Sequence, residues 1–361
     1  MLKGLKVLDL SRVLAGPLCT MTLGDLGASI IKVERPGAGD DTRGWGPPFD
    51  ERGESAYYLS VNRNKKSIAL DLDDAADRRT VHELAAEADV VVDNFKTGTL
   101  EKKGIDPRKV IESNRRLIWC TITGFGESNR RVGYDLVVQA ESGWMAITGE
   151  PDGDPMRVGV ALADIIAGKD AAISILAALA ARDSLSESER HIHVSLLASA
   201  TAALINVAQN SLVTGRDARR WGNQHPNLVP YQLFHAADRP VIIAVGSDSQ
   251  WKACARALEL SSLEADESVA TNAGRLAQRD RVIAGVAEKV RTMTASELIQ
   301  RLDPAGVPCG IVKSVLESLG EVSASPVTGI APSVPGTVRL PPPRLDEHRS
   351  EIMSLGWDSF S

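Results

Sequence analysis

The chain has 361 residues, of which 43% are hydrophobic and 24% charged, and this composition is typical of a soluble globular protein with a sizeable core. Its length allows two domains, or one large domain that carries a smaller one. The formal net charge of -6 argues against a nucleic-acid-binding protein, because such a domain usually carries a basic face.

The chain shows no sign of targeting, membrane insertion or metal binding. The first residues, Met1 to Lys6, lack the apolar core of a signal peptide, and no apolar run reaches the roughly 18 residues of a membrane span. The four cysteines lie far apart, and no H-x-x-x-H spacing occurs. We therefore expect a cytoplasmic protein with reduced cysteines, without a metal site and without a membrane or nucleic-acid partner.

The first half alternates short strands with helices. Strands are predicted at 6–10, 29–34, 67–70, 90–92 and 117–122, and helices from about 17 to 26 and at 75–88. This alternation predicts an open α/β sheet that binds ligands at the carboxyl ends of its strands. The first turn has only Ala15-Gly16-Pro17 in place of G-x-G-x-x-G, and no P-loop or G-x-S-x-G occurs, so a dehydrogenase, a P-loop hydrolase and an α/β-hydrolase are poorly supported.

Several residues at strand ends suit a nucleotide. Arg35 follows a strand, where its guanidinium can stack on a purine and bind phosphate; a solvated surface arginine is the alternative. The turns 94–98 and 123–126 each contain a phenylalanine and a glycine, although glycine turns after strands are also common for topological reasons.

The second half is predicted to contain a second domain. The apolar run from His191 to about Val213 predicts a helix, and the stretch 222–231 marks the crossing between domains. A strand is expected at 240–246, helices at 249–259, 270–291 and 295–302, a short strand at 307–312, an extended segment at 332–344 and a last helix at 349–356.

Asp164 lies where an apolar run leads into a predicted alanine-rich helix that extends to about residue 182. At a helix N-terminus its carboxylate can act as an N-cap that accepts a main-chain N–H. A carboxylate at a strand-to-helix junction, between Gly159 and Gly168, can also be presented as a nucleophile toward an acyl carbon. Periodicity alone leaves both interpretations open.

The motifs together resemble the class III CoA-transferases, the CaiB/BaiF family that includes formyl-CoA transferase and the α-methylacyl-CoA racemases. The matching segments run in the same order through nearly the whole chain. They are Val7-Leu8-Asp9-Leu10, Ala15-Gly16-Pro17, Gly24–Ala28, Lys32–Pro36, Asn64–Asp71, Asn94-Phe95, Gly124-Phe125-Gly126, Tyr134-Asp135 through Gly143, Ala163–Gly168, Val194–Leu197, Gln250-Trp251, Val307–Gly310 and Pro342–Leu345.

The resemblance implies a fold and a domain plan. The fold is α/β, with a Rossmann-like large domain built on a parallel sheet and a smaller α/β domain, in an interlocked homodimer. The large domain is expected at 1–200, a linker at 201–225, the small domain at 226–325, and a C-terminal segment that returns to the large domain at 326–361.

The resemblance also assigns roles by position. Asp164 matches the nucleophilic aspartate of the family, which favours the nucleophile over the N-cap. The residues that match CoA contacts are Val13, Ala15, Arg35, Leu70, Asn94, Phe95 and Lys102, with Arg130 or Arg131 meeting the phosphates. Lys102 stands where relatives often have arginine; it keeps the charge but lacks the planar fork.

The implied activity is CoA transfer from an acyl-CoA thioester to a free carboxylic acid, through an aspartyl mixed anhydride and an enzyme-CoA thioester. CoA is then a substrate, and no permanently bound cofactor is expected. The alternative is a racemase, which needs an acid and a base on opposite sides of the α-carbon. Tyr134 stands where the racemases have a histidine, so the transferase is favoured. A non-catalytic CoA-binding protein is a minor alternative.

Overall fold

The computed structural model describes residues 1–321 and 329–360, and their contacts divide the chain into two units. The first unit contains residues 1–145, residues 157–216 and the described part of the C-terminal segment. The second unit contains residues 146–156 and 217–321. Each unit has its own hydrophobic core, and each is described separately.

The borders of the units differ from the expected ones at two places. The first unit extends to residue 216, so helix α10 (Ile205–Thr214) belongs to it and not to a linker. Residues 146–156 belong to the second unit because Arg220 donates hydrogen bonds to the carbonyl oxygens of Glu150 (3.0 Å) and Gly153 (2.8 Å). The expected border between residues 325 and 326 lies outside the described residues.

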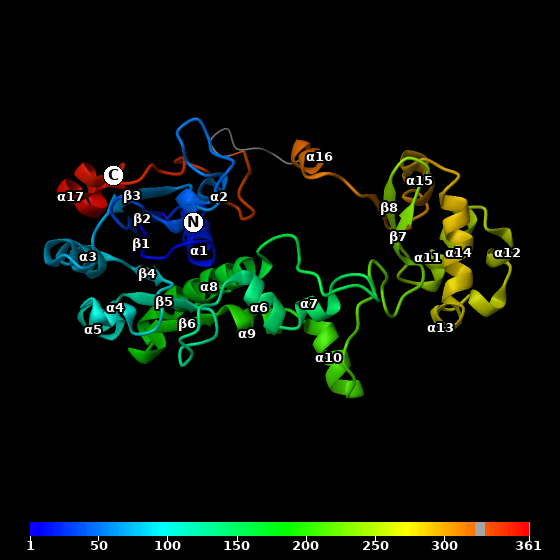
Figure 1. Ribbon diagram of the computed structural model, residues 1–361, viewed down its shortest axis with the longest axis horizontal. Coiled ribbons are helices and arrows are strands. Elements are labelled where there is room, and N and C mark those ends of the chain that lie inside the picture. Colours follow the sequence, from blue (N-terminus) through cyan, green and yellow to red (C-terminus); the bar gives the residue numbers. More distant parts are fainter. Residues whose placement is uncertain (322–328, 361) are drawn as a thin grey trace. The chain divides into compact units, whose positions relative to one another are not determined.

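The first unit is built on a six-stranded parallel sheet (Figure 1). Its strands are β1 (Lys6–Asp9), β2 (Ser29–Glu34), β3 (Lys65–Ala69), β4 (Val90–Asp93), β5 (Ile118–Thr123) and β6 (His191–Ser195). Their order, β3-β2-β1-β4-β5-β6, is that of a Rossmann sheet, which confirms the predicted α/β fold. The order reverses between β1 and β4, and this places a crevice at the carboxyl ends of these two strands.

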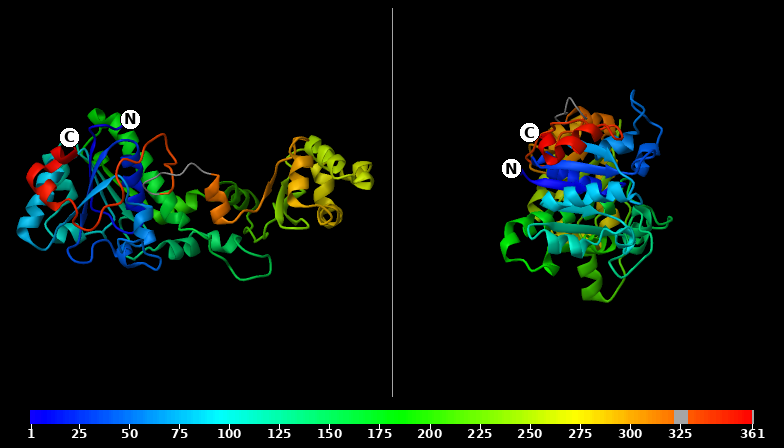
Figure 2. Two further views of the ribbon diagram at one scale, coloured as in Figure 1. Left: turned by 90° about the horizontal axis from the view of Figure 1, so that it is seen from above. Right: turned by 90° about the vertical axis from the view of Figure 1, so that its left-hand side faces the viewer.

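Helices cover both faces of this sheet, as the views in Figures 1 and 2 show. Side chains of a strand alternate between the faces, so Val7 and Val90 pack toward α1 and α8, whereas Leu8 and Val91 pack toward α3, α5 and α17. The helices of this unit are α1 (Ala15–Asp25), α2 (Ala56–Ser60), α3 (Ala75–Glu87), α4 (Thr99–Lys102), α5 (Pro107–Ser113), α6 (Asp135–Glu141), α8 (Leu162–Ala181), α9 (Leu196–Ala202), α10 and α17 (Arg349–Leu355), while α7 (Trp144–Ile147) crosses the border between the units.

The C-terminal segment lies against the sheet of the first unit. The main-chain N–H of His348 donates to the carbonyl oxygen of Ser67 on β3 (3.0 Å), and the indole of Trp357 donates to that of Leu84 on α3 (3.0 Å). Both termini are therefore part of the same unit (Figure 2).

Residues 191–213 do not form the single helix that was predicted. They contain strand β6, followed by α9 and α10. Ile192 on β6 lies opposite Cys120 on β5, so a partner about 70 residues away makes the strand. Periodicity within a short apolar run cannot distinguish such a strand from a helix.

The second unit combines a small antiparallel sheet with helices. Its strands are β7 (Tyr231–His235), β8 (Pro240–Ala244) and β9 (Cys309–Ile311), in the order β7-β8-β9. Its helices are α11 (Asp248–Ala257), α12 (Ser261–Glu264), α13 (Asn272–Ala277), α14 (Arg279–Val290), α15 (Ala295–Leu302) and α16 (Val315–Gly320). The helix predicted at 270–291 is two helices, because the backbone of Gln278 (φ -118°, ψ 31°) leaves the helical region.

Among the residues that the structure describes, no single helix is long and apolar enough to cross a membrane. The pair α9 and α10 meets the length and hydropathy requirements together, but it is bent by 71°.

Helices α1 and α8 approach each other closely at one glycine. A Cβ atom added to Gly168 on α8 would lie 2.5 Å from the carbonyl oxygen of Ala15, the first residue of α1. Because this neighbour is backbone, it cannot move aside as a flexible side chain can. Gly168 therefore sets how near the N-terminal part of α8 comes to the turn that precedes α1.

We expect the Gly168→Ala substitution to lower the free energy of unfolding by about 1–3 kcal/mol, because an extra methyl group forces the two helices apart. Chemical denaturation monitored by circular dichroism would measure this. Gly159→Ala is the matched control, because a Cβ atom there meets no atom within 4 Å. Equal stability of the two variants would contradict the prediction.

Candidate active site

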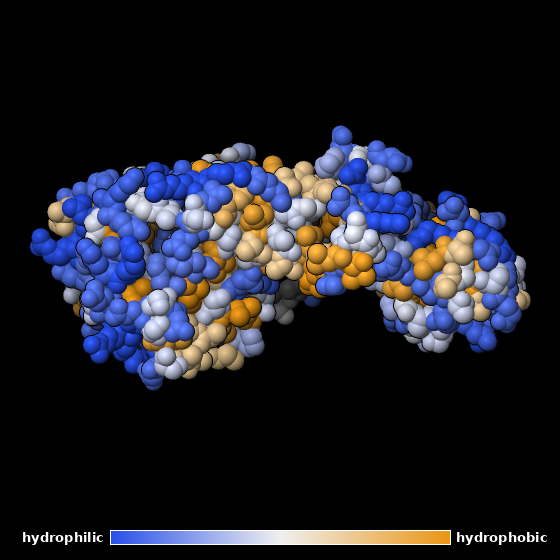
Figure 3. Space-filling model, turned by 90° about the horizontal axis from the view of Figure 1, so that it is seen from below, coloured by the Kyte–Doolittle hydropathy of each residue, from blue (hydrophilic) through white to orange (hydrophobic). Residues whose placement is uncertain are grey.

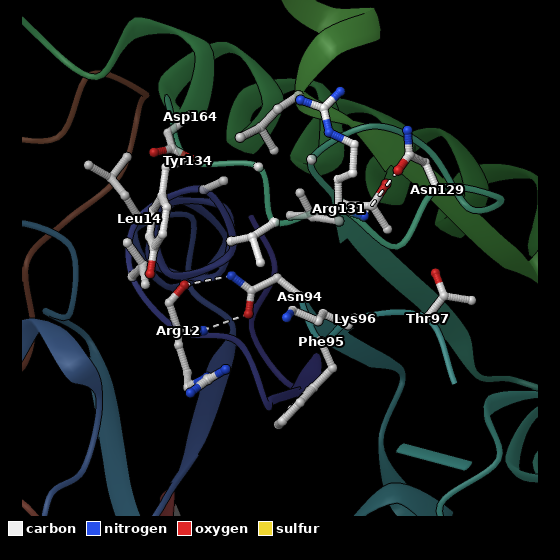
Figure 4. Close-up of a pocket in the computed structure, with 18 of the residues that line it drawn as sticks. Arg12, Leu14, Asn94, Phe95, Lys96, Thr97, Asn129, Arg131, Tyr134 and Asp164 are labelled. Carbon is white, nitrogen blue, oxygen red and sulfur yellow. Dashed lines mark hydrogen bonds between the residues drawn. The ribbon is translucent and has the colours of Figure 1, made fainter. Parts of the chain in front are cut away.

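The crevice between β1 and β4 contains a pocket that we call the Asp164 pocket (Figure 4). Most of its lining residues come from the loops after β1, β4 and β5 and from the N-terminal turn of α8, and the others come from the end of β5, the segment after β2 and the start of α9. The lining residues are Arg12, Val13, Leu14, Ala15, Asp41, Asn94, Phe95, Lys96, Thr97, Ile122, Thr123, Gly124, Asn129, Arg130, Arg131, Val132, Gly133, Tyr134, Asp164 and Leu196. Asp164, Tyr134 and Leu14 lie on one side of the open space, and Thr97 and Asn129 lie on the other.

The turn after β1 is held in a strained conformation. Val13 has φ +71°, in the left-handed region that a β-branched residue rarely adopts. Its main-chain N–H faces the carboxylate of Asp40, at 3.2 Å and 3.3 Å from the two oxygens. The ammonium of buried Lys32 bridges Asp40 (3.0 Å) and the carbonyl oxygen of Ser11 (2.8 Å). These contacts fix the main chain of Val13 and Ala15 at the pocket, where the resemblance places CoA contacts.

Asn94 joins the turn after β4 to the turn after β1. Its side-chain oxygen accepts the N–H of Arg12 (2.9 Å), and its side-chain nitrogen donates to the carbonyl oxygen of Arg12 (2.6 Å), as the dashed lines in Figure 4 show. The Arg12 guanidinium lies 5.3 Å from the centre of the Phe95 ring and 3.1 Å from Asp41. Sequence reasoning missed Arg12, because its only local feature is its place directly after the first strand.

Asp164 lies in the first turn of α8, but it is not the N-cap. The cap position is Ala161, which has no side-chain hydrogen bond, so the N-cap interpretation is wrong. No strand precedes the helix either, because residues 157–161 are irregular. Instead, Asp135 on α6 accepts the N–H groups of Ala163 (2.8 Å) and Asp164 (3.4 Å) and thus caps the helix from another element.

Burial, and then the charge of Asp135, raise the pKa of Asp164 from its usual 3.8 to about 7. Desolvation and a neighbouring like charge both disfavour the ionised form. The carboxylate is thus poorly solvated, half-buried and open to the pocket. A carboxylate in this state is a stronger nucleophile than a solvated one, and at neutral pH a substantial fraction is ionised.

Asp135 is itself held in place by Gln139. The side-chain nitrogen of Gln139 donates to Asp135 (2.6 Å), while its oxygen accepts the N–H of Val158 (2.8 Å) in the segment that leads into α8. Both residues belong to a motif that carried the resemblance, but the sequence did not show what they do. Their role depends on the packing of α6 against α8.

Tyr57 on α2 is a second residue that sequence reasoning missed. Burial, and then the charges of Asp164 and Asp135, raise its pKa to about 12. Its phenol therefore stays protonated at neutral pH.

A second pocket, which we call the Arg35 pocket, adjoins the first, and Arg12 and Phe95 line both. It combines apolar walls, among them Leu10, Val33 and Leu70, with the cations Arg35 and Lys103. Arg35 is paired with Asp41 (3.1 Å) and Lys103 with Asp73 (2.6 Å). The structure thus brings Arg35, Leu70 and Phe95 together here, and Val13, Ala15, Asn94, Arg130, Arg131 and Asp164 together in the Asp164 pocket.

Lys102 is the exception among the predicted residues. Its side chain is exposed and lines neither of these pockets, whereas its neighbour Lys103 lines the Arg35 pocket. The two lysines point differently because they lie at the end of the short helix α4 (Thr99–Lys102), where successive residues turn to different sides. Sequence position alone could not distinguish them.

In the part of the chain that the structure describes, no three His, Cys, Asp or Glu side chains are grouped so as to hold a metal ion. Within the same residues, no histidine lines the Asp164 pocket. The site therefore offers two partly buried carboxylates, Asp164 and Asp41, beside four cationic side chains, Arg12, Lys96, Arg130 and Arg131. Asp41 is already paired with Arg12 (3.1 Å), whereas Asp164 has no such partner among the described residues. Such an arrangement suits a nucleophilic carboxylate next to a bound polyanion.

Comparisons with known proteins agree with this chemistry. Residues 2–328 match the sequence profile of CoA-transferase family III. The chain is 40% identical to the succinyl-CoA:glutarate CoA-transferase of Homo sapiens, over 98% of this chain and 85% of that protein, and 38% identical to the succinate–glutarate CoA-transferase of Agrobacterium fabrum, over 98% and 95%. The crystal structure of a CaiB/BaiF family protein from Brucella suis superposes with a TM-score of 0.84 at 38% identity, covering 98% of each chain.

The chain belongs to CoA-transferase family III and is therefore an enzyme that moves CoA from an acyl-CoA to a carboxylate. The family and the activity expected from the sequence are both confirmed.

We expect Asp135→Asn to lower the apparent pKa of the pH–rate profile from about 7 by about one pH unit, because it removes the like charge beside Asp164. The profile of kcat/KM for the acyl-CoA between pH 5 and 9 would show this. Asp183→Asn, at an exposed position just after the C-terminus of α8, is the control. An unchanged profile in Asp135→Asn would show that this charge does not act on the reacting group.

We expect Lys103→Ala to raise the KM for acyl-CoA several-fold and Lys102→Ala to leave it within about twofold, because only Lys103 faces the Arg35 pocket. Exposed charge contacts of this kind are weak and screened by salt, so the effect should fall as ionic strength rises. Steady-state kinetics at low and high salt would test both variants. A larger effect of Lys102→Ala would restore the assignment made from the sequence.

Proposed function

We propose that this enzyme transfers CoA between two dicarboxylic acids, with succinyl-CoA as a donor and a C5 dicarboxylate of the glutarate class as an acceptor. The names of relatives in two distant organisms, both about 40% identical over nearly the whole chain, support this substrate class. The observation that carries the mechanism is the half-buried Asp164 carboxylate, which lies in the helix turn that Asp135 caps and faces a cation-lined pocket.

The proposed reaction uses Asp164 as the nucleophile. Its carboxylate oxygen attacks the thioester carbonyl, the C–S bond breaks, and CoA leaves as a thiolate from a mixed anhydride. The thiolate then attacks the Asp164 carbonyl, which releases the first acid and leaves an aspartyl-CoA thioester. The acceptor carboxylate attacks this thioester, the C–S bond breaks, and CoA leaves again as a thiolate from a second anhydride. Attack of the thiolate on the acceptor carbonyl then yields the new acyl-CoA and free Asp164.

The pockets suggest how acyl-CoA is held. The apolar walls and Arg35 of the Arg35 pocket suit the adenine ring and a phosphate, as the resemblance implies. Arg130 and Lys96 of the Asp164 pocket suit further phosphates. The thioester would then reach Asp164 past Val13 and Ala15.

We also propose the homodimer that the resemblance implies. Helix α10 has no buried residue, and Ile205, Leu212 and Val213 are each about three-quarters exposed. Apolar patches are visible on the face seen from below, the side on which α10 lies (Figure 3). Apolar helix faces of this kind usually mark an interface. The cytoplasmic location stays a prediction.

The first test is an exchange assay with succinyl-CoA and glutarate, with hydroxylamine added to trap the acylated enzyme. Wild type should form glutaryl-CoA and carry a hydroxamate at Asp164 by mass spectrometry, whereas Asp164→Asn should do neither. CoA binding without exchange would favour the non-catalytic alternative. Deuterium exchange at the α-carbon of a 2-methylacyl-CoA without CoA transfer would favour the racemase.

Loss of activity in Asp164→Asn should not come from unfolding. The folded state binds the Asp164 proton more tightly than the unfolded chain does. Ionisation of Asp164 therefore lowers the free energy of unfolding as the pH rises from about 4 to 7. Asp164→Asn removes this cost, and the variant should be more stable than wild type at pH 8, by at most about 4 kcal/mol, and equally stable near pH 4. Thermal unfolding at both pH values would test this. Lower stability of the variant at pH 8 would contradict the buried, destabilised carboxylate.

A further inference from the structure

The loop between β5 and α6 forms one wall of the Asp164 pocket and closes on itself at two glycines. A Cβ atom on Gly124 would lie 2.5 Å from the Cα atom of Gly133, and one on Gly133 would lie 2.4 Å from that of Gly124. The two ends of the loop 124–133 therefore lie in close backbone contact. Thr97 after β4 donates to the carbonyl oxygen of Glu127 (3.0 Å) and joins the loop to the neighbouring turn.

Arg131 ties this loop to helix α6. Its Nη1 donates to Oε2 of Glu141 at 3.0 Å, and its Nη2 donates to Oε1 of the same carboxylate. The guanidinium also lies 4.3 Å from the centre of the Phe125 ring within the loop. Glu141 is the last residue of α6, and Arg131 lies four residues before its start, so the pair spans the whole helix. Figure 4 shows Arg131 between Asp164 and Asn129, along the upper edge of the pocket in this view.

Arg130 differs from Arg131 although both line the pocket. Within residues 1–321 and 329–360, the side chain of Arg130 makes no hydrogen bond and no ion pair. Lys96, across the same pocket, also has no carboxylate partner there. A bidentate, ring-stacked guanidinium must break two hydrogen bonds to reach a ligand, whereas an unpaired one can bind phosphate at no such cost.

We propose that Arg130, together with Lys96, is the cation that contacts the phosphates of acyl-CoA, and that Arg131 is a positioning residue that acts through Glu141. The inference rests on the proposed function, because it assigns the phosphates to the Asp164 pocket. Arg131 fixes the direction in which the chain enters α6. The first residue of that helix, Asp135, caps α8 and so places Asp164. Loss of the pair should therefore disturb the reacting carboxylate and leave the CoA contacts intact.

The test compares Arg130→Ala, Arg131→Ala, Glu141→Ala and the charge swap Arg131→Glu/Glu141→Arg. CoA itself is the calorimetric ligand, measured at low and high salt, and kcat and KM come from the exchange assay. Arg130→Ala should weaken CoA binding about 10-fold and reduce its salt dependence. Arg131→Ala and Glu141→Ala should each lower kcat by a similar factor, with CoA affinity within about twofold of wild type. The charge swap should recover most of the kcat.

Glu141→Ala separates the two assignments most clearly. If Arg131 bound the phosphates, Glu141→Ala would free it from its carboxylate, leave kcat unchanged and keep or tighten CoA binding. Arg131→Ala would then lose more CoA affinity than Arg130→Ala. Either result would overturn the proposal. Failure of the charge swap to recover kcat, with thermal unfolding unchanged, would also contradict it. Calorimetry measures CoA binding without turnover. If the enzyme binds CoA but does not exchange it, the proposed function is refuted. The CoA affinities of the variants would still decide between Arg130 and Arg131.

Discussion

A buried ionic network beneath the first β–α turn is the constraint on which the rest of the site depends. Lys65 donates to Asp9 (3.0 Å), and all four side chains of the pairs Lys65–Asp9 and Lys32–Asp40 are fully buried. Burial alone would raise the pKa of Asp9, but Lys65, Lys32 and two hydroxyl groups hold it at about 2. Removal of one partner would leave an uncompensated buried charge, which typically costs about 3–5 kcal/mol. The network therefore holds the turn, and with it the strained Val13.

The site forms where this turn meets α8. The close contact at Gly168 sets the distance between α8 and the start of α1, and Asp135 on α6 caps the first turn of α8. Asp164 consequently lines the same pocket as Val13 and Ala15, and its side chain has no hydrogen-bond partner among the described residues. This burial raises the pKa of Asp164, because it destabilises the ionised carboxylate, and the same destabilisation makes the carboxylate reactive.

The cations around the crevice differ in their roles. The buried cations Lys32 and Lys65 stabilise the turn and are not available to a ligand. Cations that face the open pockets are of two kinds: Arg12, Arg35, Lys103 and Arg131 are already paired with carboxylates, whereas Arg130 and Lys96 have no carboxylate partner among the described residues. A polyanionic thioester thus meets both preformed ion pairs, which shape the walls, and unpaired cations, which can neutralise it.

The sequence by itself determined the parallel sheet, most of its strands, and the place of Asp164 at the start of a buried helix. These features depend on local periodicity and on motifs that run in order along the chain. Tertiary structure alone decided that β6 is a strand, that Asp135 rather than Asp164 caps α8, and that Lys103 rather than Lys102 faces the Arg35 pocket. The physical reason for the first two is that a strand partner and a cap from another helix are contacts between residues far apart in the sequence, which no local pattern contains. The two lysines differ because successive residues at the end of α4 turn to different sides, and only the folded chain shows which side faces the pocket.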